Sequence, residues 1–157
     1  MEVNVLNHYN FSLLNIKEDD IDKLIDVFFI LIFDTSGLLS TPYYKKQHSN
    51  LLMLAFDDVS DDNLKVKKNK HPYSEEHNKL LYEFIKKHKD KRVCYVCCTA
   101  GISRSGAVGT FINNFYGESQ VEFLKRNPDV APNSRILRML NQLYRLEKDS
   151  FDMQKKI

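Results

Sequence analysis

The stretch from Arg92 to Phe115 constrains the fold of this chain more than any other part of the sequence. It begins with β-branched, aromatic and small apolar residues and reaches Cys98, after which five residues separate that cysteine from Arg104. Apolar residues then recur with the period of an α-helix, at Ala107, Val108, Phe111, Ile112 and Phe115. The pattern predicts a strand that ends at Cys98, a tight loop, and a helix that begins at Arg104.

A loop between a strand and a helix N-terminus is suited to binding an anion. Its N–H groups can converge on one point, where the helix dipole adds positive potential. Gly101 lets the backbone curl without a Cβ clash, and Arg104 offers a planar fork for two phosphate oxygens. We expect Cys98 to be a thiolate at neutral pH in such a loop. The predicted phosphate-binding residues are Thr99, Ala100, Gly101, Ile102, Ser103 and Arg104.

The residues from Cys98 to Ser105, C-T-A-G-I-S-R-S, resemble the C-x5-R-S/T signature of cysteine-dependent protein tyrosine phosphatases. The A-G-I-S-R-S part is similar to the dual-specificity branch, which includes MAP-kinase phosphatases and small poxviral phosphatases. The resemblance covers residues 10–148 and includes A-P-N-S-R-I-L-R-M-L near the C-terminus. It implies a phosphatase-type α/β fold, a cysteinyl-phosphate intermediate, a phosphorylated protein as substrate, and no metal or other cofactor.

Hydrolysis of a phosphate ester also needs an acid that protonates the leaving group. The loop after the predicted strand 51–56 offers four candidates, Asp57, Asp58, Asp61 and Asp62. In the resembling family the acid occupies the second position after this strand, which selects Asp58 as the catalytic acid and leaves Asp57 as the alternative. The resemblance also implies that Ser105 helps the Cys98 thiolate to leave; the alternative is an ordinary hydroxyl in the first helical turn.

The residue before the nucleophile departs from the family pattern. The family has histidine there, whereas this chain has Cys97, and a thiol is a weak hydrogen-bond donor. We expect activity to survive, but a pseudophosphatase that only binds phosphate stays open. Cys94 or Cys97 could also capture an oxidised Cys98; the alternative is that both are plain buried thiols.

The loop from Asp57 to His71 is longer than is usual for the family. It carries acidic residues first and then Lys65, Lys67, Lys68 and Lys70. These lysines could form a basic rim that attracts an acidic phosphoprotein, or they could be a solvated surface of no special function.

Strand-like and helix-like patterns alternate along the rest of the chain. A first strand is expected around residues 11–14 and a short helix over 21–28, and the apolar runs 27–33 and 51–56 are typical of buried strands. Helix and strand patterns overlap at residues 25–28, so the boundary between the two elements stays open. Later helices should begin at Pro72, with Ser74 in the first turn, at Ser119, and at Asn133 or Ser134; the first of them should bury Leu80, Leu81, Phe84 and Ile85. The alternation predicts an α/β fold with a central, mostly parallel twisted sheet of four to five strands and helices on both faces.

The length of 157 residues fits a single catalytic domain over residues 1–157, with 149–157 as a frayed tail. A net charge of +2 gives no sign of nucleic-acid binding, and the longest apolar run is too short for a membrane span. Three cysteines and the absence of a recognisable signal peptide favour a reducing compartment. We therefore expect a cytoplasmic protein (host cytoplasm or virion if it is viral), either monomer or homodimer.

These features predict a dual-specificity protein phosphatase that hydrolyses phosphotyrosine and phosphoserine/threonine esters. Two alternatives use the same chemistry on another substrate, namely an RNA 5′-triphosphatase and a phosphoinositide phosphatase. The third is the phosphate-binding pseudophosphatase.

Overall fold

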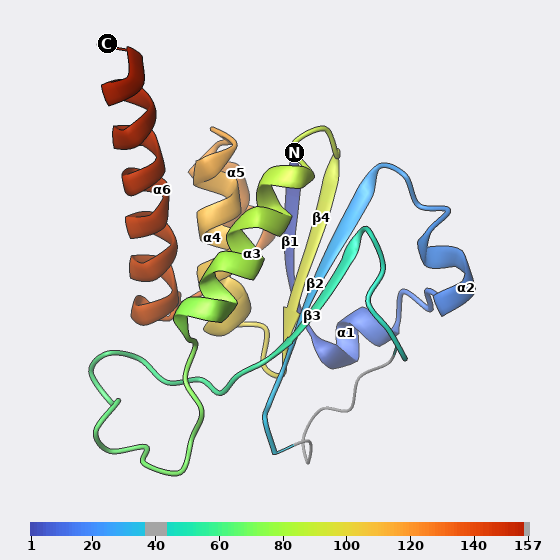
Figure 1. Ribbon diagram of the computed structural model, residues 1–157. Helices are drawn as coiled ribbons and strands as arrows, with labels where there is room; N and C mark the ends of the chain where they lie inside the picture. The colour runs from blue at the N-terminus through green and yellow to red at the C-terminus, as the bar shows by residue number, and fades with distance from the viewer. Residues whose placement is uncertain (37–43, 156–157) are drawn as a thin grey trace.

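Four parallel strands form one sheet in the computed structural model, which describes residues 1–36 and 44–155 (Figure 1). In spatial order they are β1 (Glu2–Asn7), β4 (Val93–Cys98), β2 (Val27–Phe33) and β3 (Leu51–Ala55). Because the strands are parallel, their carboxyl ends meet at one edge of the sheet. Cys98 lies at that edge in a central strand, paired with Asn7 of β1. The predicted α/β class and strand number are confirmed.

Helices cover both faces of the sheet. Strand β2 shows this most clearly. Its residues Phe28, Ile30 and Ile32 pack in the larger core cluster, on one face of the sheet. The residues between and after them, Phe29, Leu31 and Phe33, pack in the smaller cluster on the other face. The larger cluster lies under α3 (Glu75–Lys87), α4 (Arg104–Phe115), α5 (Gln120–Arg126) and α6 (Ser134–Lys155). The smaller cluster lies under the short helices α1 (His8–Ser12) and α2 (Glu18–Ile21) (Figure 1).

Two of the N-terminal predictions are wrong. The first strand is β1 rather than residues 11–14, because the Asn7 side chain accepts a hydrogen bond from the Asn10 N–H and starts α1 directly after the strand. The predicted helix 21–28 is only the four-residue α2. Phe28 belongs instead to β2, where the strand pairs with β4.

Helix α3 begins at Glu75, three residues later than predicted: Ser74 is its N-cap, not part of its first turn, and forms a reciprocal hydrogen-bond pair with His77. Its buried stripe differs from the prediction at one position: Leu80 is 57% exposed. Tyr82 is buried instead and packs on Phe111 of α4. Helix α6 begins where Asn133 accepts a hydrogen bond from the Ile136 N–H, and it continues through residues 149–155, where a frayed tail is expected.

No helix within the described residues has both the length and the apolar character to cross a membrane.

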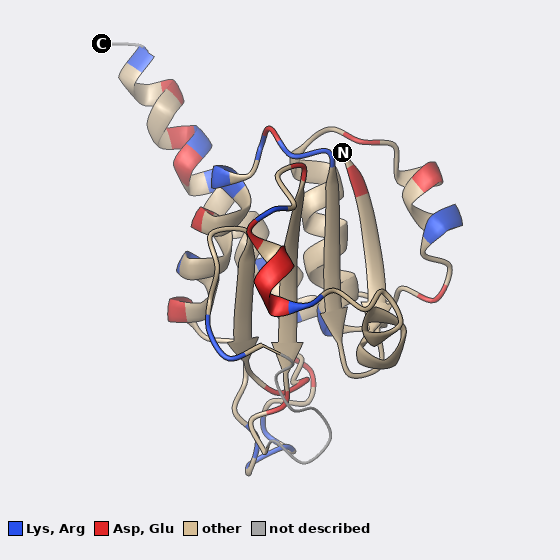
Figure 2. Cartoon of the chain, turned by 90° about the vertical axis from the view of Figure 1, so that its right-hand side faces the viewer, with Lys and Arg blue, Asp and Glu red and all other residues tan. Residues whose placement is uncertain are grey.

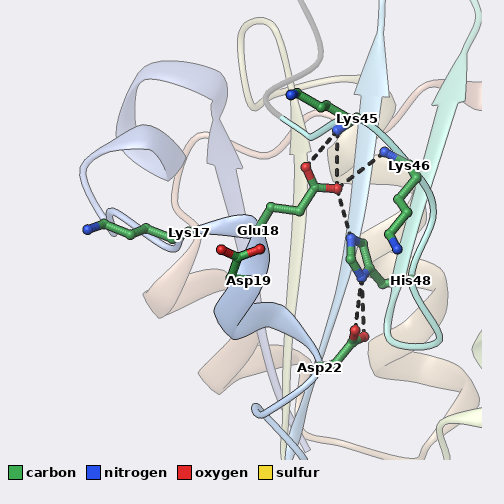
Figure 3. A pocket seen from close by; sticks show the side chains of 7 residues that line it. All are labelled: Lys17, Glu18, Asp19, Asp22, Lys45, Lys46 and His48. Carbon is green, nitrogen blue, oxygen red and sulfur yellow. Dashed lines mark hydrogen bonds and ion pairs between the residues drawn. The ribbon is translucent and has the colours of Figure 1, made fainter.

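A charged cluster ties α2 to the segment that leads into β3 (Figure 3). The Glu18 carboxylate accepts hydrogen bonds from the N–H groups of Lys45 (2.9 Å) and Lys46 (3.3 Å) and lies 2.9 Å from His48 Nε2. The other ring nitrogen of His48 lies 3.2 Å from Asp22, and the His48 side chain is only 4% exposed. The hydrogen bond to Glu18 raises the pKa of His48. Hydrogen bonds, first from Lys45 N–H and then from His48, lower the pKa of Glu18.

Because the pKa of His48 is raised and that of Glu18 is lowered, the contact between them should stabilise the folded chain only within a window of pH. The His48 contribution is fully present below its ordinary pKa of 6.5 and is lost as pH rises through its raised pKa in the folded chain. The Glu18 contribution is present above its ordinary 4.5 and is lost as pH falls through its lowered pKa. The stabilising effect of His48, compared with His48→Gln, should therefore shrink from pH 6 to pH 8.5. Urea unfolding of both chains across this range measures it, and a pH-independent difference contradicts the assignment.

Candidate active site

The loop of residues 99–104, the predicted phosphate-binding loop, curls back over the Cys98 sulfur. Gly101 has φ +69°, and a Cβ there would lie 2.5 Å from the backbone nitrogen of Asn7. The turn brings the Gly101 N–H to 3.3 Å from Cys98 Sγ, while the Ser105 hydroxyl lies 3.0 Å from the same sulfur. Although Cys98 is only 2% exposed, its sulfur is therefore directed toward the loop and the first turn of α4.

Two carbonyl groups of the loop are hydrogen-bonded to the segment that precedes α6, while most of its N–H groups have no partner. The Ile102 carbonyl accepts a hydrogen bond from Ala131 N–H (3.1 Å), and the Ser103 carbonyl accepts one from Asn133 N–H (3.0 Å). Within the described parts of the chain, five backbone N–H groups of the loop make no hydrogen bond: those of Thr99, Ala100, Ile102, Ser103 and Arg104. Together with the N-terminus of α4, they form a site for an anion.

The guanidinium of Arg104 is held in place along one edge. Its Nη1 donates to the Phe56 carbonyl (2.8 Å) and lies 2.8 Å from Asp34 Oδ1, and Nη2 lies 3.4 Å from the Thr99 hydroxyl. Nε makes no hydrogen bond to any described residue. Nε–H and one N–H of Nη2 therefore remain as a parallel pair, which matches two oxygens of a phosphate.

Asp34 also lies at the candidate site, although the sequence patterns did not point to it. Besides its ion pair with Arg104, it accepts a hydrogen bond from the Thr99 hydroxyl (3.1 Å). The available signal was its position directly after β2, since the carboxyl ends of neighbouring parallel strands share one edge. Residues 37–43, which follow Asp34 closely in the sequence, lie outside the described residues.

Asp58 lies against the phosphate-binding loop. Its Oδ1 accepts hydrogen bonds from the Ser103 hydroxyl (2.9 Å) and from Asn133 Nδ2 (2.8 Å). Neither hydrogen bond involves Oδ2, the carboxyl oxygen that could then carry a proton. The structure thus places the preferred acid candidate beside the loop.

Asp57 points to a different part of the molecule. It is buried and accepts hydrogen bonds from Thr35 N–H (3.0 Å), the Thr35 hydroxyl (2.6 Å) and His71 N–H (2.8 Å). Burial favours a higher pKa for Asp57, but the hydrogen bonds from His71 and Thr35 outweigh it and lower the pKa. A carboxylate held in this way is a poor proton donor. Asp61 pairs with Arg135 and Arg138 of α6, and Asp62 is exposed.

The other two cysteines are buried thiols, and burial raises the pKa of each. Cys97 packs in the core cluster on the opposite face of the sheet from Cys98. Cys94 shares the face of Cys98 but lies four residues away along β4, about 13 Å at the usual rise per residue. A disulfide needs Cα atoms within about 7 Å. While β4 is intact, neither geometry suits capture of an oxidised Cys98.

Among the described residues, no three His, Cys, Asp or Glu side chains gather in a way that could hold a metal ion.

No protein-family model matches the sequence, and a search of curated proteins finds no match. Among solved structures, the chain is similar to the crystal structure of human tyrosine phosphatase-like serine/threonine/tyrosine-interacting protein. The TM-score is 0.50 at 18% identity, over 83% of this chain and 85% of that one. The fold is tyrosine phosphatase-like. The similarity to poxviral phosphatases stays a prediction from the sequence, as do the roles of the individual site residues.

Two substitutions of Asp34 can distinguish the effect of its negative charge on anion binding from the effect of its contacts with Arg104 and Thr99. Asp34→Ala removes the partner of both Arg104 and Thr99, so tungstate, a phosphate-shaped anion, should bind about tenfold more weakly, the equivalent of one hydrogen bond. Asp34→Asn keeps an acceptor while removing a negative charge near the anion, so binding should be at least as tight as in the unchanged chain. Titration calorimetry measures both; equal binding by Asp34→Ala and the unchanged chain contradicts the positioning role.

Proposed function

We propose that this chain is a cysteine-dependent protein phosphatase that hydrolyses phosphotyrosine and phosphoserine/threonine esters. The observation that carries the proposal is the position of the Cys98 sulfur, 3.3 Å from Gly101 N–H and 3.0 Å from the Ser105 hydroxyl. The unpaired N–H groups of the loop and the open edge of Arg104 lie in the same loop and helix turn. The proposed nucleophile and the proposed phosphate site therefore belong to the same strand–loop–helix segment. The tyrosine phosphatase-like fold is consistent with this chemistry.

In the first step the Cys98 thiolate attacks phosphorus, so that a P–S bond forms while the bond to the leaving oxygen breaks. The electron pair of that bond goes to the leaving oxygen, which takes the proton from Asp58. The loop N–H groups and Arg104 stabilise the negative charge on the three other phosphate oxygens.

In the second step Asp58, now a carboxylate, removes a proton from water as the water oxygen attacks phosphorus. The P–S bond breaks, its electrons return to sulfur, and inorganic phosphate leaves. The Ser105 hydroxyl lies within hydrogen-bond distance of the sulfur, so it can donate to the departing thiolate.

The proposed substrate is a phosphorylated protein rather than a 5′-triphosphorylated RNA. The five residues between Cys98 and Arg104 are uncharged, whereas RNA triphosphatases of this type usually carry basic residues there. The three free cysteines favour a reducing compartment such as the cytoplasm. Whether the chain acts as a monomer or a homodimer does not alter this chemistry.

The covalent intermediate gives a direct test. Acid quenching of the unchanged chain during turnover of a ³²P-labelled phosphotyrosine peptide should leave label on Cys98. Cys98→Ser should carry no label and release no phosphate, because a serine hydroxyl is not ionised at neutral pH. Label on another residue, or phosphate release by Cys98→Ser, would overturn the assigned nucleophile.

The role of Asp58 predicts a dependence on the leaving group. Asp58→Ala should slow phenyl phosphate hydrolysis by about 10²–10⁴-fold. It should slow p-nitrophenyl phosphate less, because p-nitrophenoxide leaves more readily without a proton. Asp57→Asn is the matched control: it should lower stability by weakening the contacts to Thr35 and His71, yet leave the ratio of the two rates unchanged. The assignment fails if Asp58→Ala hydrolyses phenyl phosphate at the normal rate.

A phosphate-binding protein without turnover is the second candidate. Two observations favour it: Cys97 stands where the resembling family has histidine, and the similar human structure is described as an interacting protein. Release of p-nitrophenol from its phosphate ester distinguishes the candidates, because only an enzyme produces it catalytically.

A further inference from the structure

The segment Asp57–His71 is an ordered loop that is closed at its base. Asp57 N–H donates to the His71 carbonyl (2.7 Å), and His71 N–H donates to the Asp57 carboxylate (2.8 Å). The Asn63 carbonyl accepts hydrogen bonds from Val66 and Lys67 and forms a turn in the middle of the loop. Asp61 is bound by two arginines of α6. These contacts hold the loop at its base, its middle and its side.

The loop starts at the candidate active site. Asp58, its second residue, contacts Ser103 of the phosphate-binding loop, and Lys67 Nζ donates to the Asp58 carbonyl (2.9 Å). In Figure 1 the loop extends from the carboxyl edge of the sheet, the edge at which β4 ends. A substrate whose phosphate enters the loop of residues 99–104 therefore has this segment beside it.

The exposed surface of the segment carries more positive than negative charge. The carboxylate of Asp57 is buried in hydrogen bonds, and that of Asp61 is neutralised by Arg135 and Arg138. The charged side chains that remain in solvent without an arginine partner are mostly basic: Lys65, Lys67, Lys68 and Lys70, against the single carboxylate of Asp62. Figure 2 shows blue segments at this end of the molecule, beyond the strand arrowheads.

The composition of the segment fits a peptide better than a nucleic acid. Leu64 and Val66 alternate with the lysines, and Val66 is 82% exposed, so both can contact a peptide chain. The sequence of the segment contains no Phe, Tyr or Trp on which bases could stack.

We propose that the segment Asp57–His71 is a basic wall of the active site that binds acidic residues flanking the phosphorylated residue of a protein substrate. This inference rests on the proposed function and specifies its substrate class. Lys65, Lys68 and Lys70 supply the selectivity, while Lys67 is fixed on the Asp58 carbonyl.

The test uses Cys98→Ser, so that binding is measured without turnover. Two phosphotyrosine peptides of equal length are compared, one with Asp and Glu around the phosphotyrosine and one with Ser and Gly. The acidic peptide should bind about tenfold more tightly at low ionic strength, since exposed ion pairs contribute modestly and are weakened by salt. Changing Lys65, Lys68 and Lys70 to Gln should remove this preference, and changing them to Arg should keep it.

A variant with Gln at Lys87, Lys89 and Lys148 is the matched control. These lysines are exposed on α3, just after it and on α6, and their loss changes the net charge equally. The preference for the acidic peptide should persist in this control, and thermal unfolding checks that all variants are folded. An equal preference in the Lys65/Lys68/Lys70→Gln variant would overturn the proposal.

Two further outcomes are informative. If the Lys65/Lys68/Lys70→Gln variant loses affinity for 5′-phosphorylated single-stranded RNA but not for the acidic peptide, the wall is not a peptide site and the proposal is overturned. If the unchanged chain fails to hydrolyse p-nitrophenyl phosphate while peptide binding still depends on these lysines, the wall is supported and only the proposed catalysis fails.

Discussion

Burial of the Arg104 guanidinium is the constraint on which the rest of the site depends. Arg104 is only 5% exposed, and a buried charge is tolerated only when it is paired and hydrogen-bonded. Its partners are Asp34, at the end of β2, and the Phe56 carbonyl, just after β3. Because all strands are parallel, β2 and β3 deliver these groups to the edge where β4 delivers Cys98. The sheet topology thus fixes which edge of the guanidinium remains for a ligand.

The adjacent residues Asp57 and Asp58 make contacts of two different kinds. Asp57 is committed to Thr35 and His71, which close the base of the following loop. The next side chain turns toward Ser103 and Asn133, so Asp58 lies beside the phosphate site. Asp57 stabilises the loop, and Asp58 is thereby held at the position where the proposed mechanism requires an acid.

The parts of the site that are close in sequence could be predicted, and the parts that depend on distant contacts could not. Cys98, Gly101, Arg104 and Ser105 lie within eight residues, so a strand, a turn and a helix start determine their relative positions. Asp34 lies 65 residues before Thr99, and its role follows only from the strand order. Similarly, Leu80 and Tyr82 fit a helical stripe almost equally well, and only the packing of α3 on α4 and α6 decides which is buried.

The proposed function requires that residues 99–104 form an anion site with the Cys98 sulfur directed at its centre. A crystal structure of the chain with vanadate tests this most directly. Vanadium should be bonded to Cys98 Sγ, and its oxygens should accept hydrogen bonds from the loop N–H groups and from Nε and Nη2 of Arg104. Vanadate bound elsewhere, or a Cys98 sulfur turned into the core beneath an empty loop, would contradict it.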